Sequence, residues 1–193
     1  MSVQTERALA QSLIKLLSKK TLDKITVRDI TDDCGVNRQT FYYHFHDVYD
    51  LVEWIFVDRS RAYMEDGITL GNWKNILLRI MSDLREDRSF TMNTYYSLTR
   101  RELDEFMTKL FRPAFRQLMD QVMEEHRISE KDQDFIVNIY TYAVVGVLTE
   151  WIASGMPEEF IRDLDRLYEA VGGTMAFSVE NLEKADRSPF DWK

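Results

Sequence analysis

A short segment near the N-terminus concentrates side chains that can hydrogen-bond to nucleic acid. Basic, amide, hydroxyl, aromatic and imidazole groups follow one another closely, at Arg38, Gln39, Thr40, Tyr42, Tyr43 and His44. Such groups can reach phosphate oxygens and base edges. In a helix, Phe41 and Phe45 lie four residues apart and share one face, which leaves the polar and amphipathic groups outside. The segment therefore predicts a helix with a DNA-binding surface.

The residues before this helix predict a second helix and a tight turn. Thr26 is a good N-cap, and Asp29 completes a pair that resembles a capping box. Gly35 supplies the left-handed residue that ends the helix, and Asn37 caps the next one. An apolar stripe upstream can cover both helices, at Leu9, Leu13, Leu16 and Leu17. We therefore predict a three-helix unit with a helix-turn-helix over residues 1–46.

Nine residues of this unit are candidate DNA contacts. We expect base edges to be reached by Gln39, Thr40 and Tyr43, and phosphates to be held mainly by Thr26, Arg28, Tyr42 and His44, with Asn37 and Arg38 completing the set. Two alternatives remain open. The tyrosines could be ordinary surface aromatics of a helical bundle, and His44 could have a structural role.

The motif resembles the N-terminal domain of the TetR family of one-component regulators. The resemblance covers about residues 5–55 and rests on Thr26, Gly35-Val36, Asn37 and the run Thr40-Phe41-Tyr42-Tyr43-His44-Phe45, followed by Leu51. It implies an all-α protein, with a three-helix DNA-binding domain and a C-terminal helical domain for dimerisation and effector binding.

Three positions depart from the family pattern. Asn37 stands where Ser is commoner, and Cys34 replaces the usual Ala; we expect Cys34 to be a small buried residue, with a redox switch as the alternative. Val48 occupies a place where the family often has Lys. Val48 either removes a phosphate contact or is buried against the first helix.

Charge is distributed unevenly along the chain. The net charge is −8, yet residues 1–46 hold seven Lys and Arg against five Asp and Glu. The first segment can meet phosphate while the acidic remainder is repelled by it. A single Cys excludes an internal disulfide and, with no signal peptide visible, predicts a cytoplasmic protein. The longest uncharged run, 135–149, is shorter than the roughly 20 residues of a membrane span, so we expect no membrane partner.

The rest of the chain predicts a helical effector and dimerisation domain over 47–186, with a tail over 187–193. The expected helices cover 47–66, 73–86, 90–98, 101–127, 130–154 and a last segment from Pro157 to about 182. Pro113 should kink or break its helix, and Gly172-Gly173 should interrupt or loosen the last one.

The family resemblance implies that the last two long helices form a homodimer as a four-helix bundle. We predict the interface at Tyr142, Ala143, Gly146, Val147 and Trp151, and an effector pocket at Tyr95, Tyr96, Met107, Phe111, Phe115 and Tyr140, most of which could instead be plain core. Glu150 is either a partly exposed interface charge or a pocket carboxylate. The segments Trp54-Ile55-Phe56 and Thr149-Glu150-Trp151, with Trp73, resemble the branch that contains regulators of dihydroxyacetone kinase operons.

Signatures of catalysis and metal binding are absent from the sequence. It has no Gly-rich phosphate loop, no Gly-x-Ser-x-Gly elbow and no recognisable Cys/His dyad. His44 and His46 do not share a helix face, so we expect no metal site. Because catalytic motifs are also absent from the sequence, we expect no cofactor and no enzyme activity. The prediction is a ligand-responsive repressor that binds a double-stranded operator as a homodimer, with a small molecule or a protein as effector. The alternative is a helical protein-interaction module or co-activator that depends on a protein partner.

Overall fold

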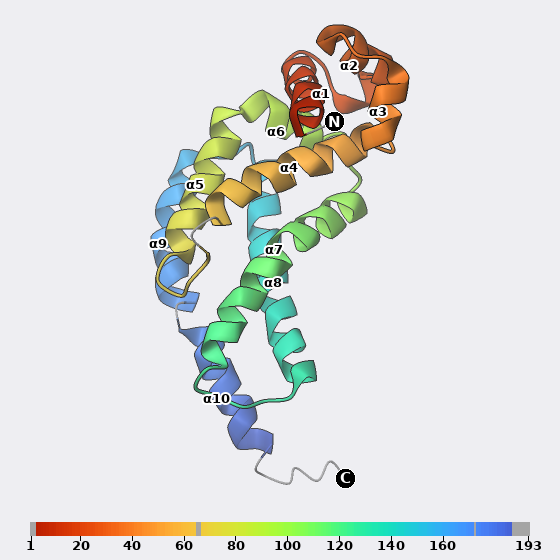
Figure 1. Cartoon of the computed structure of the whole chain (residues 1–193). Helices are drawn as coiled ribbons and strands as arrows, with labels where there is room; N and C mark the ends of the chain where they lie inside the picture. The colour runs from red at the N-terminus through yellow and green to blue at the C-terminus, as the bar shows by residue number, and fades with distance from the viewer. Residues whose placement is uncertain (1–2, 65–66, 172, 187–193) are drawn as a thin grey trace. The chain divides into compact units, whose positions relative to one another are not determined.

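The computed structural model describes residues 3–64, 67–171 and 173–186. Over these ranges the chain is helical and contains no strand, which confirms the all-α prediction. The helices are α1 (Val3–Leu17), η1 (Leu22–Lys24), α2 (Val27–Cys34), α3 (Arg38–His44), α4 (Val48–Met64), α5 (Trp73–Glu86), α6 (Arg88–Tyr95), α7 (Arg100–Val122), α8 (Glu130–Ala153), α9 (Glu158–Val171) and α10 (Thr174–Asp186) (Figure 1). The expected tail, 187–193, lies outside the described residues.

The chain divides into two compact units, and α5 and α7 each run from one unit into the other. The first unit comprises Met1–Glu65 and Ser82–Phe106, and the second comprises Asp66–Met81 and Met107–Lys193. The domain prediction placed one boundary at residue 46, whereas this division assigns α4 and α6 to the same unit as the helix-turn-helix.

The first unit is built around α1, which packs against α2, α4 and α6. Leu9, Leu13 and Leu17 are fully buried at a spacing of four residues, as expected for one face of a helix. The Ser12 hydroxyl donates a buried hydrogen bond of 3.0 Å to the Ile30 carbonyl and so ties α1 to α2. Val48 belongs to the same core and is only 9% exposed. The structure therefore favours burial of Val48 over a lost phosphate contact.

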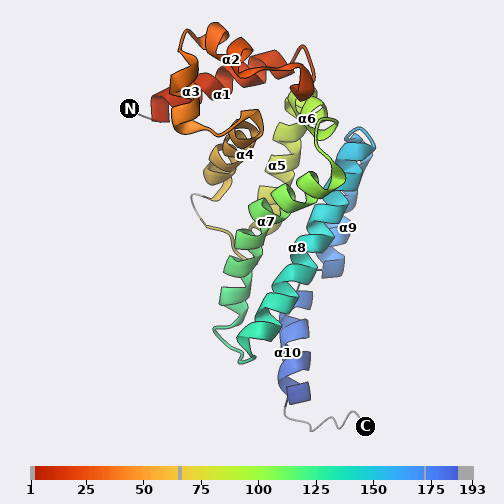
Figure 2. The same cartoon turned by 90° about the vertical axis from the view of Figure 1, so that its right-hand side faces the viewer.

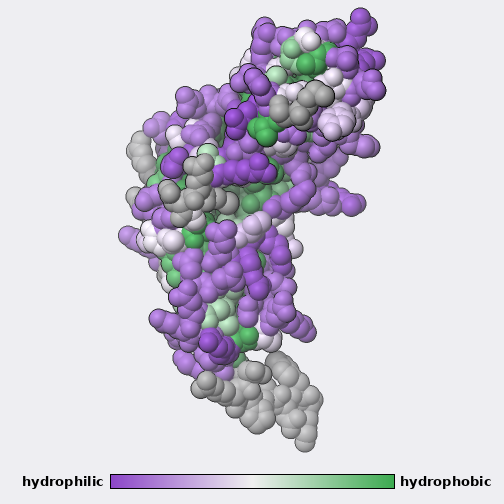
Figure 3. All heavy atoms as spheres, in the orientation of Figure 1, coloured by the Kyte–Doolittle hydropathy of each residue, from purple (hydrophilic) through white to green (hydrophobic). Residues whose placement is uncertain are grey.

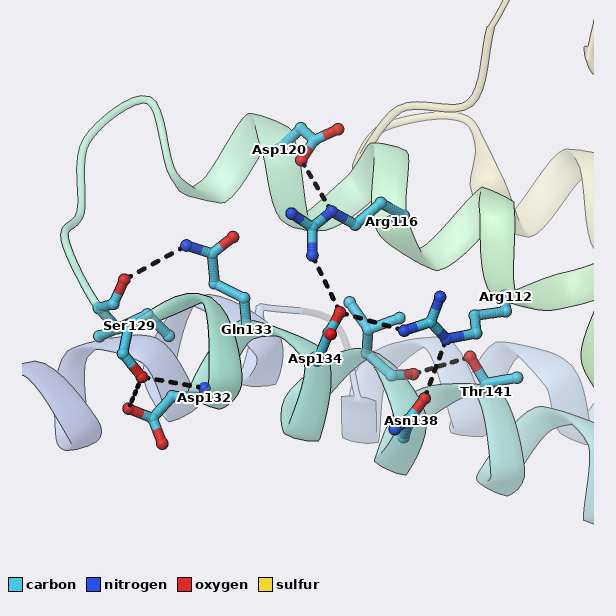
Figure 4. Close-up of polar contacts among 11 residues, drawn as sticks. Arg112, Arg116, Asp120, Ser129, Asp132, Gln133, Asp134, Asn138 and Thr141 are labelled. Carbon is cyan, nitrogen blue, oxygen red and sulfur yellow. Dashed lines mark hydrogen bonds and ion pairs between the residues drawn. The ribbon is translucent and has the colours of Figure 1, made fainter.

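The second unit contains the helix pairs α8–α10 and α9–α10 (Figure 2). Polar side chains also join α7 to α8 in a seam. In the seam, one Asp134 carboxylate oxygen accepts hydrogen bonds of 3.1 Å from both Arg112 and Arg116 (Figure 4). The Arg112 Nε also donates to the Asn138 side-chain oxygen at 3.1 Å. Because these side chains are partly exposed, their hydrogen bonds and ion pairs contribute little to stability. We infer that they mainly align α7 with α8.

The core of this unit includes one face of α8. Val137, Leu148 and Trp151 are buried there, and the Trp151 indole donates a hydrogen bond of 3.0 Å to the Pro157 carbonyl. By length and composition alone, α8 is a candidate membrane span. The core helix of a soluble protein passes the same test, and one face of α8 is buried in the second unit.

Helix boundaries follow the sequence closely, with two exceptions. The range of α5 is as predicted, and the expected interruption of the last helix is confirmed by α9 ending at Val171 and α10 beginning at Thr174. A break at Pro113 was wrong, since α7 continues through it. The predicted end of α7 at 127 was also wrong, because Arg127 is not in the helix and instead donates a hydrogen bond of 2.7 Å to the Met123 carbonyl.

Candidate DNA-binding surface and neighbouring sites

The outer face of α3 carries four exposed polar or amphipathic side chains. Phe41 is fully buried beneath it, while Tyr42 is 60% and Tyr43 79% exposed. Arg38 and Gln39 are exposed one turn earlier, each four residues before a tyrosine. Residues four apart lie one above the other on a helix, so the face consists of two parallel rows. Arg38 makes no hydrogen bond or ion pair with any described residue and is available to a ligand.

The start of α3 is fixed by its N-cap. The Asn37 side-chain oxygen accepts hydrogen bonds from the Thr40 backbone N–H at 2.7 Å and from the Thr40 hydroxyl at 3.0 Å. The preceding turn depends on Gly35, whose φ of 72° is left-handed and costs little only for glycine. Asn37 and Thr40 therefore fix the start of α3 in the free protein. To reach a base, the Thr40 hydroxyl would have to break its hydrogen bond with the Asn37 side chain.

His44 is anchored inside the first unit. Its side chain is 8% exposed, and its Nδ1 lies 3.4 Å from the Glu6 carboxylate on α1. The ring also makes an edge contact with Tyr43, with the centroids 5.0 Å apart. This burial favours the structural role that the sequence had left open, because little of the ring is exposed to a phosphate and its Nδ1 already faces Glu6. No local pattern in the sequence indicated Glu6 as its partner.

The capping box predicted for α2 is confirmed. The Thr26 hydroxyl accepts from the Asp29 backbone N–H at 3.2 Å, and the Asp29 carboxylate accepts from the Thr26 backbone N–H at 2.8 Å. That backbone N–H, with the Thr26 hydroxyl and Lys20, lowers the pKa of Asp29 to about 2. Thr26 is therefore a helix cap in this structure, and its expected phosphate contact would place the phosphate close to a carboxylate.

Acidic side chains balance the basic ones on and around α2. Arg28 lies 3.4 Å from Asp32, with both side chains exposed, and Lys15 pairs with Asp33. The Lys15 hydrogen bond lowers the pKa of Asp33. An exposed pair such as Arg28–Asp32 contributes at most about 1 kcal/mol, so Arg28 can exchange its partner for a phosphate. Electrostatic attraction to DNA is therefore modest for this unit.

The second unit holds a largely apolar pocket of about 610 Å³, including its open mouth. It is lined by Leu70, Trp73, Phe115, Leu118, Tyr140, Ala143, Val144, Val147, Gly173 and Met175. Of the predicted effector residues, Phe115 and Tyr140 are among them. Met107 and Phe111 are buried core residues of α7 outside the lining.

Tyr95 and Tyr96 do not belong to this pocket, since both lie in the first unit and Tyr96 is 67% exposed. The sequence missed Val144 and Val147 as pocket residues. With Tyr140, their spacing of four and three residues could have indicated a shared helix face.

An exposed apolar stripe runs along α8. Phe135 is 61%, Ile139 48% and Tyr142 60% exposed, and a Cβ built on Gly146 meets nothing within 4 Å. The spacing of four, three and four residues places them on one helix face, which we call the α8 stripe. On the face of the molecule drawn in Figure 3, hydrophilic residues predominate, so a stripe of large exposed apolar side chains is unusual for this surface.

Only some of the residues predicted for the dimer interface lie on or beside the α8 stripe. Tyr142 and Gly146 lie on the stripe, and Ala143 is exposed beside it. Trp151 was wrongly placed in the interface, because it is fully buried in its own protomer. Val147 is half-buried and lines the pocket.

Other candidate groups have structural surroundings. Glu150 is exposed and does not line the pocket. Cys34 is half-buried, and burial raises the pKa of its thiol, which disfavours a reactive thiolate. His126 Nδ1 lies 3.3 Å from the Glu183 carboxylate, and the His126 side chain is 19% exposed. Within the described ranges, no three His, Cys, Asp or Glu side chains lie close enough to hold a metal ion.

Comparison with known proteins agrees with this geometry. Residues 12–54 match bacterial regulatory proteins of the tetR family, and residues 71–169 match a transcriptional regulator C-terminal region. The chain is 22% identical over 188 residues to the HTH-type dhaKLM operon transcriptional activator DhaS of Lactococcus lactis subsp. lactis (strain IL1403), covering 94% of each chain.

Two solved structures share the fold. The dihydroxyacetone kinase operon activator DhaS has a TM-score of 0.65 at 22% identity, covering 94% of this chain and 99% of that one. A TetR transcriptional regulator from Streptococcus agalactiae 2603V has a TM-score of 0.55 at 20% identity, covering 86% of this chain and 91% of that one.

Proposed function

The chain belongs to the TetR family of bacterial regulatory proteins, and from that premise we propose that it is a ligand-responsive regulator that binds operator DNA as a homodimer. The family match makes it a DNA-binding transcription regulator. The operator contacts, the dimer and the response to a ligand are our proposals.

The exposed face of α3 carries the proposal for DNA contact. Gln39 and Tyr43 form one row, which we assign to base edges, and Arg38 and Tyr42 form the other, which we assign to the phosphate backbone. Gln can bond bidentately to adenine, and a tyrosine ring can pack against a thymine methyl group. The caps at Thr26 and Asn37 and the buried His44 hold α3 in place, so these residues act mainly by positioning.

The α8 stripe supports the homodimer. Phe135, Ile139 and Tyr142 are too large and too exposed to be left in water without cost, and Gly146 lets a second backbone approach closely. Phe177 on α10 is also 59% exposed and can extend the interface. A helix-on-helix interface of obligate type buries about 2,000 Å² or more. Two recognition helices could then enter successive major grooves about 34–36 Å apart.

The direction of regulation has two candidates. Repression follows from the sequence prediction, in which a ligand favours a dimer geometry that no longer fits the operator. Activation is favoured by the relative that matches 94% of the chain, since that protein is named an activator of the dhaKLM operon. A reporter gene behind the regulated promoter separates the two: deleting this regulator raises expression if it represses and lowers expression if it activates.

Fluorescence anisotropy with labelled DNA from the region flanking the coding sequence tests the operator proposal. We expect specific binding that survives excess unrelated duplex, and its loss when Arg38, Gln39, Tyr42 and Tyr43 are all replaced by Ala. Unchanged binding by this variant would place the DNA contact elsewhere. Failure of the wild type to prefer any flanking sequence would favour the helical protein-interaction module instead.

A further inference from the structure

We propose that the pocket of the second unit is a binding site for an uncharged, flat, mainly apolar molecule that carries a hydrogen-bond acceptor. This inference rests on the proposed ligand-responsive function for its biological meaning, and it adds the place of the ligand and its chemical class. The space in the pocket amounts to about 610 Å³ when the open solvent at its mouth is included.

The described lining carries no charge. Aromatic rings are contributed by Trp73, Phe115 and Tyr140, aliphatic groups surround them, and none of the described residues that line the pocket is Asp, Glu, Lys, Arg or His. A charged ligand would lose its hydration on entering and find no counter-charge among the lining residues. A polyhydroxylated molecule would leave several hydroxyls without partners. Apolar surface, in contrast, is favourably removed from water here.

Two polar groups can orient the ligand. The Tyr140 hydroxyl is hydrogen-bonded at 2.8 Å to the Thr174 hydroxyl, which fixes its position at the start of α10. Trp73 lines the pocket, and its indole N–H makes no hydrogen bond to a described residue, so this donor can serve a ligand. One available donor in an otherwise apolar wall selects for a ligand with an acceptor, because the donor gains a bond that apolar contacts cannot give.

Packing behind the lining makes the aromatic wall rigid. The Trp73 ring packs on Tyr168 with the centroids 5.2 Å apart, and Lys74 Nζ lies 5.0 Å from the centroid of the Tyr168 ring. Phe115 and Tyr140 are likewise paired, with centroids 6.3 Å apart and rings inclined by 32°. A preformed wall costs little ordering on binding, which favours a flat ligand that can lie against it.

The position of the pocket on α8 argues against a second protein chain as its occupant. Residues advance by about 100° around a helix, so Tyr140, on the pocket side, and Gly146, on the α8 stripe, point about 120° apart. A partner helix lying along the stripe would therefore leave the pocket flank uncovered. Ala143, exposed and also lining the pocket, lies between the two and brings a bound ligand close to the dimer seam.

Isothermal titration calorimetry on the full chain without DNA tests the site, with 2-naphthol as the uncharged probe and 2-naphthalenesulfonate as its charged analogue. We expect saturable binding of 2-naphthol at one site per chain, and binding of the sulfonate at least tenfold weaker. Val144→Phe should fill the pocket and weaken 2-naphthol at least tenfold. Val3→Phe makes the same change at an exposed position outside the pocket and should leave binding unchanged.

The hydrogen-bond donor is tested by comparing 2-naphthol with naphthalene, which lacks the acceptor. The wild type should prefer 2-naphthol several-fold, and Trp73→Phe should abolish that preference while retaining some affinity for both. Thermal melting of each variant shows whether it is folded, and Val147→Phe replaces Val144→Phe if the latter is not.

Three results would overturn the proposal. One is equal binding of the charged and uncharged probes, and another is undiminished binding by both folded pocket variants. The third is absence of binding to the wild type with binding to a monomeric Gly146→Arg variant, which would show that a second copy occupies the pocket. Because DNA is absent, none of these results bears on operator binding, and a failed operator assay would leave this site standing.

Discussion

The two units expose aromatic side chains of different chemistry. On α3 the exposed rings are Tyr42 and Tyr43, which carry hydroxyls and stand beside Arg and Gln. On α8 the exposed groups include Phe135 and Ile139, which have no polar atoms, beside a glycine one turn beyond Tyr142. Exposure alone is similar in the two places. The neighbouring residues indicate that the first surface meets a polar, charged partner and the second an apolar one.

The units also differ in how charge is used. In the first, Asp29, Asp32 and Asp33 each face a basic side chain, which limits attraction to phosphate and leaves recognition to the α3 face. In the second, ion pairs such as those of Asp134 join α7 to α8, while the pocket and the α8 stripe carry little charge. In our proposal, sequence recognition belongs to the first unit, and assembly and ligand binding belong to the second.

The largest expected effect comes from breaking the stripe. Gly146→Arg places a bulky charge where two backbones are proposed to meet, so the protein should become monomeric. Operator affinity should fall about 100-fold or more, because a single head loses the effective concentration supplied by the second. The protomer should remain folded, since a side chain at this position meets open space and Arg favours a helix more than Gly does.

Light scattering and the operator assay measure this outcome together. Gly71→Arg is the matched control, because Gly71 is exposed, off the stripe and uncrowded, with only the Thr69 hydroxyl within 4 Å. It should stay dimeric and bind DNA normally. A dimeric Gly146→Arg protein with normal operator affinity would disprove the interface and remove the contrast between the two surfaces.

A smaller effect is expected on α3. Tyr43→Ala should cost about 1–3 kcal/mol of specific binding, or roughly 5- to 150-fold, and change the preferred base at one position in a binding-site selection. Tyr43→Phe removes only the hydroxyl, so it should distinguish the contribution of the hydroxyl to binding from that of the ring. Tyr96→Ala removes an equally exposed tyrosine elsewhere in the first unit and should have no effect. If Tyr43→Ala weakened all sequences alike, Tyr43 would belong to the phosphate row.

Val48 sharpens the comparison by testing the core beneath the DNA-binding helices. Val48→Lys should lower the free energy of unfolding by about 1–3 kcal/mol, because the ammonium group must leave the core or be buried. Tyr49→Lys, at the adjacent and 44% exposed position, should change it by about 0.5 kcal/mol or less. Urea denaturation measures both. Tighter binding to any DNA by a stable Val48→Lys protein would show that Val48 lies at the phosphate backbone instead.

Much of the first unit could be predicted because its signals are local. The Thr26–Asp29 capping box, the Gly35 turn and the Asn37 cap depend on residues within a few positions of one another. The role of His44 could not be predicted, since its partner Glu6 lies on another helix far along the chain. In both units, core residues were predicted correctly where apolar residues recur on one helix face over several turns.

The pocket and interface were harder to predict because both draw on α8. Its apolar residues surround most of the helix, so periodicity could not separate the core face, the pocket flank and the exposed stripe. Trp151 and Val147 were assigned to the dimer interface for this reason. Trp73, Gly173 and Met175 reach the pocket from elements distant in sequence, and only the fold brings them together.

Arg28 tests the electrostatic half of the comparison. Arg28→Ala should weaken binding to all DNA sequences a few-fold and reduce the slope of log affinity against log salt by about one unit. Arg28→Lys should restore most of both. Lys131→Ala removes a cation from the exposed start of α8 and should change neither. An unchanged slope for Arg28→Ala would mean that Asp32 retains Arg28 in the complex.

The smallest effect concerns acid stability of the first unit. The pKa of Asp29 is about 2 in the folded chain, against an ordinary value of 3.8. As pH falls, the unfolded chain therefore takes up this proton first, and the stabilisation that is complete above about pH 4 is lost as pH falls towards 2. The melting temperature of the wild type should exceed that of Asp29→Asn at pH 5, and the gap should close towards pH 2. Other carboxylates titrate in both proteins and cancel in this difference. A gap independent of pH would show that the side-chain geometry of the capping box, and not the charge of Asp29, stabilises the start of α2.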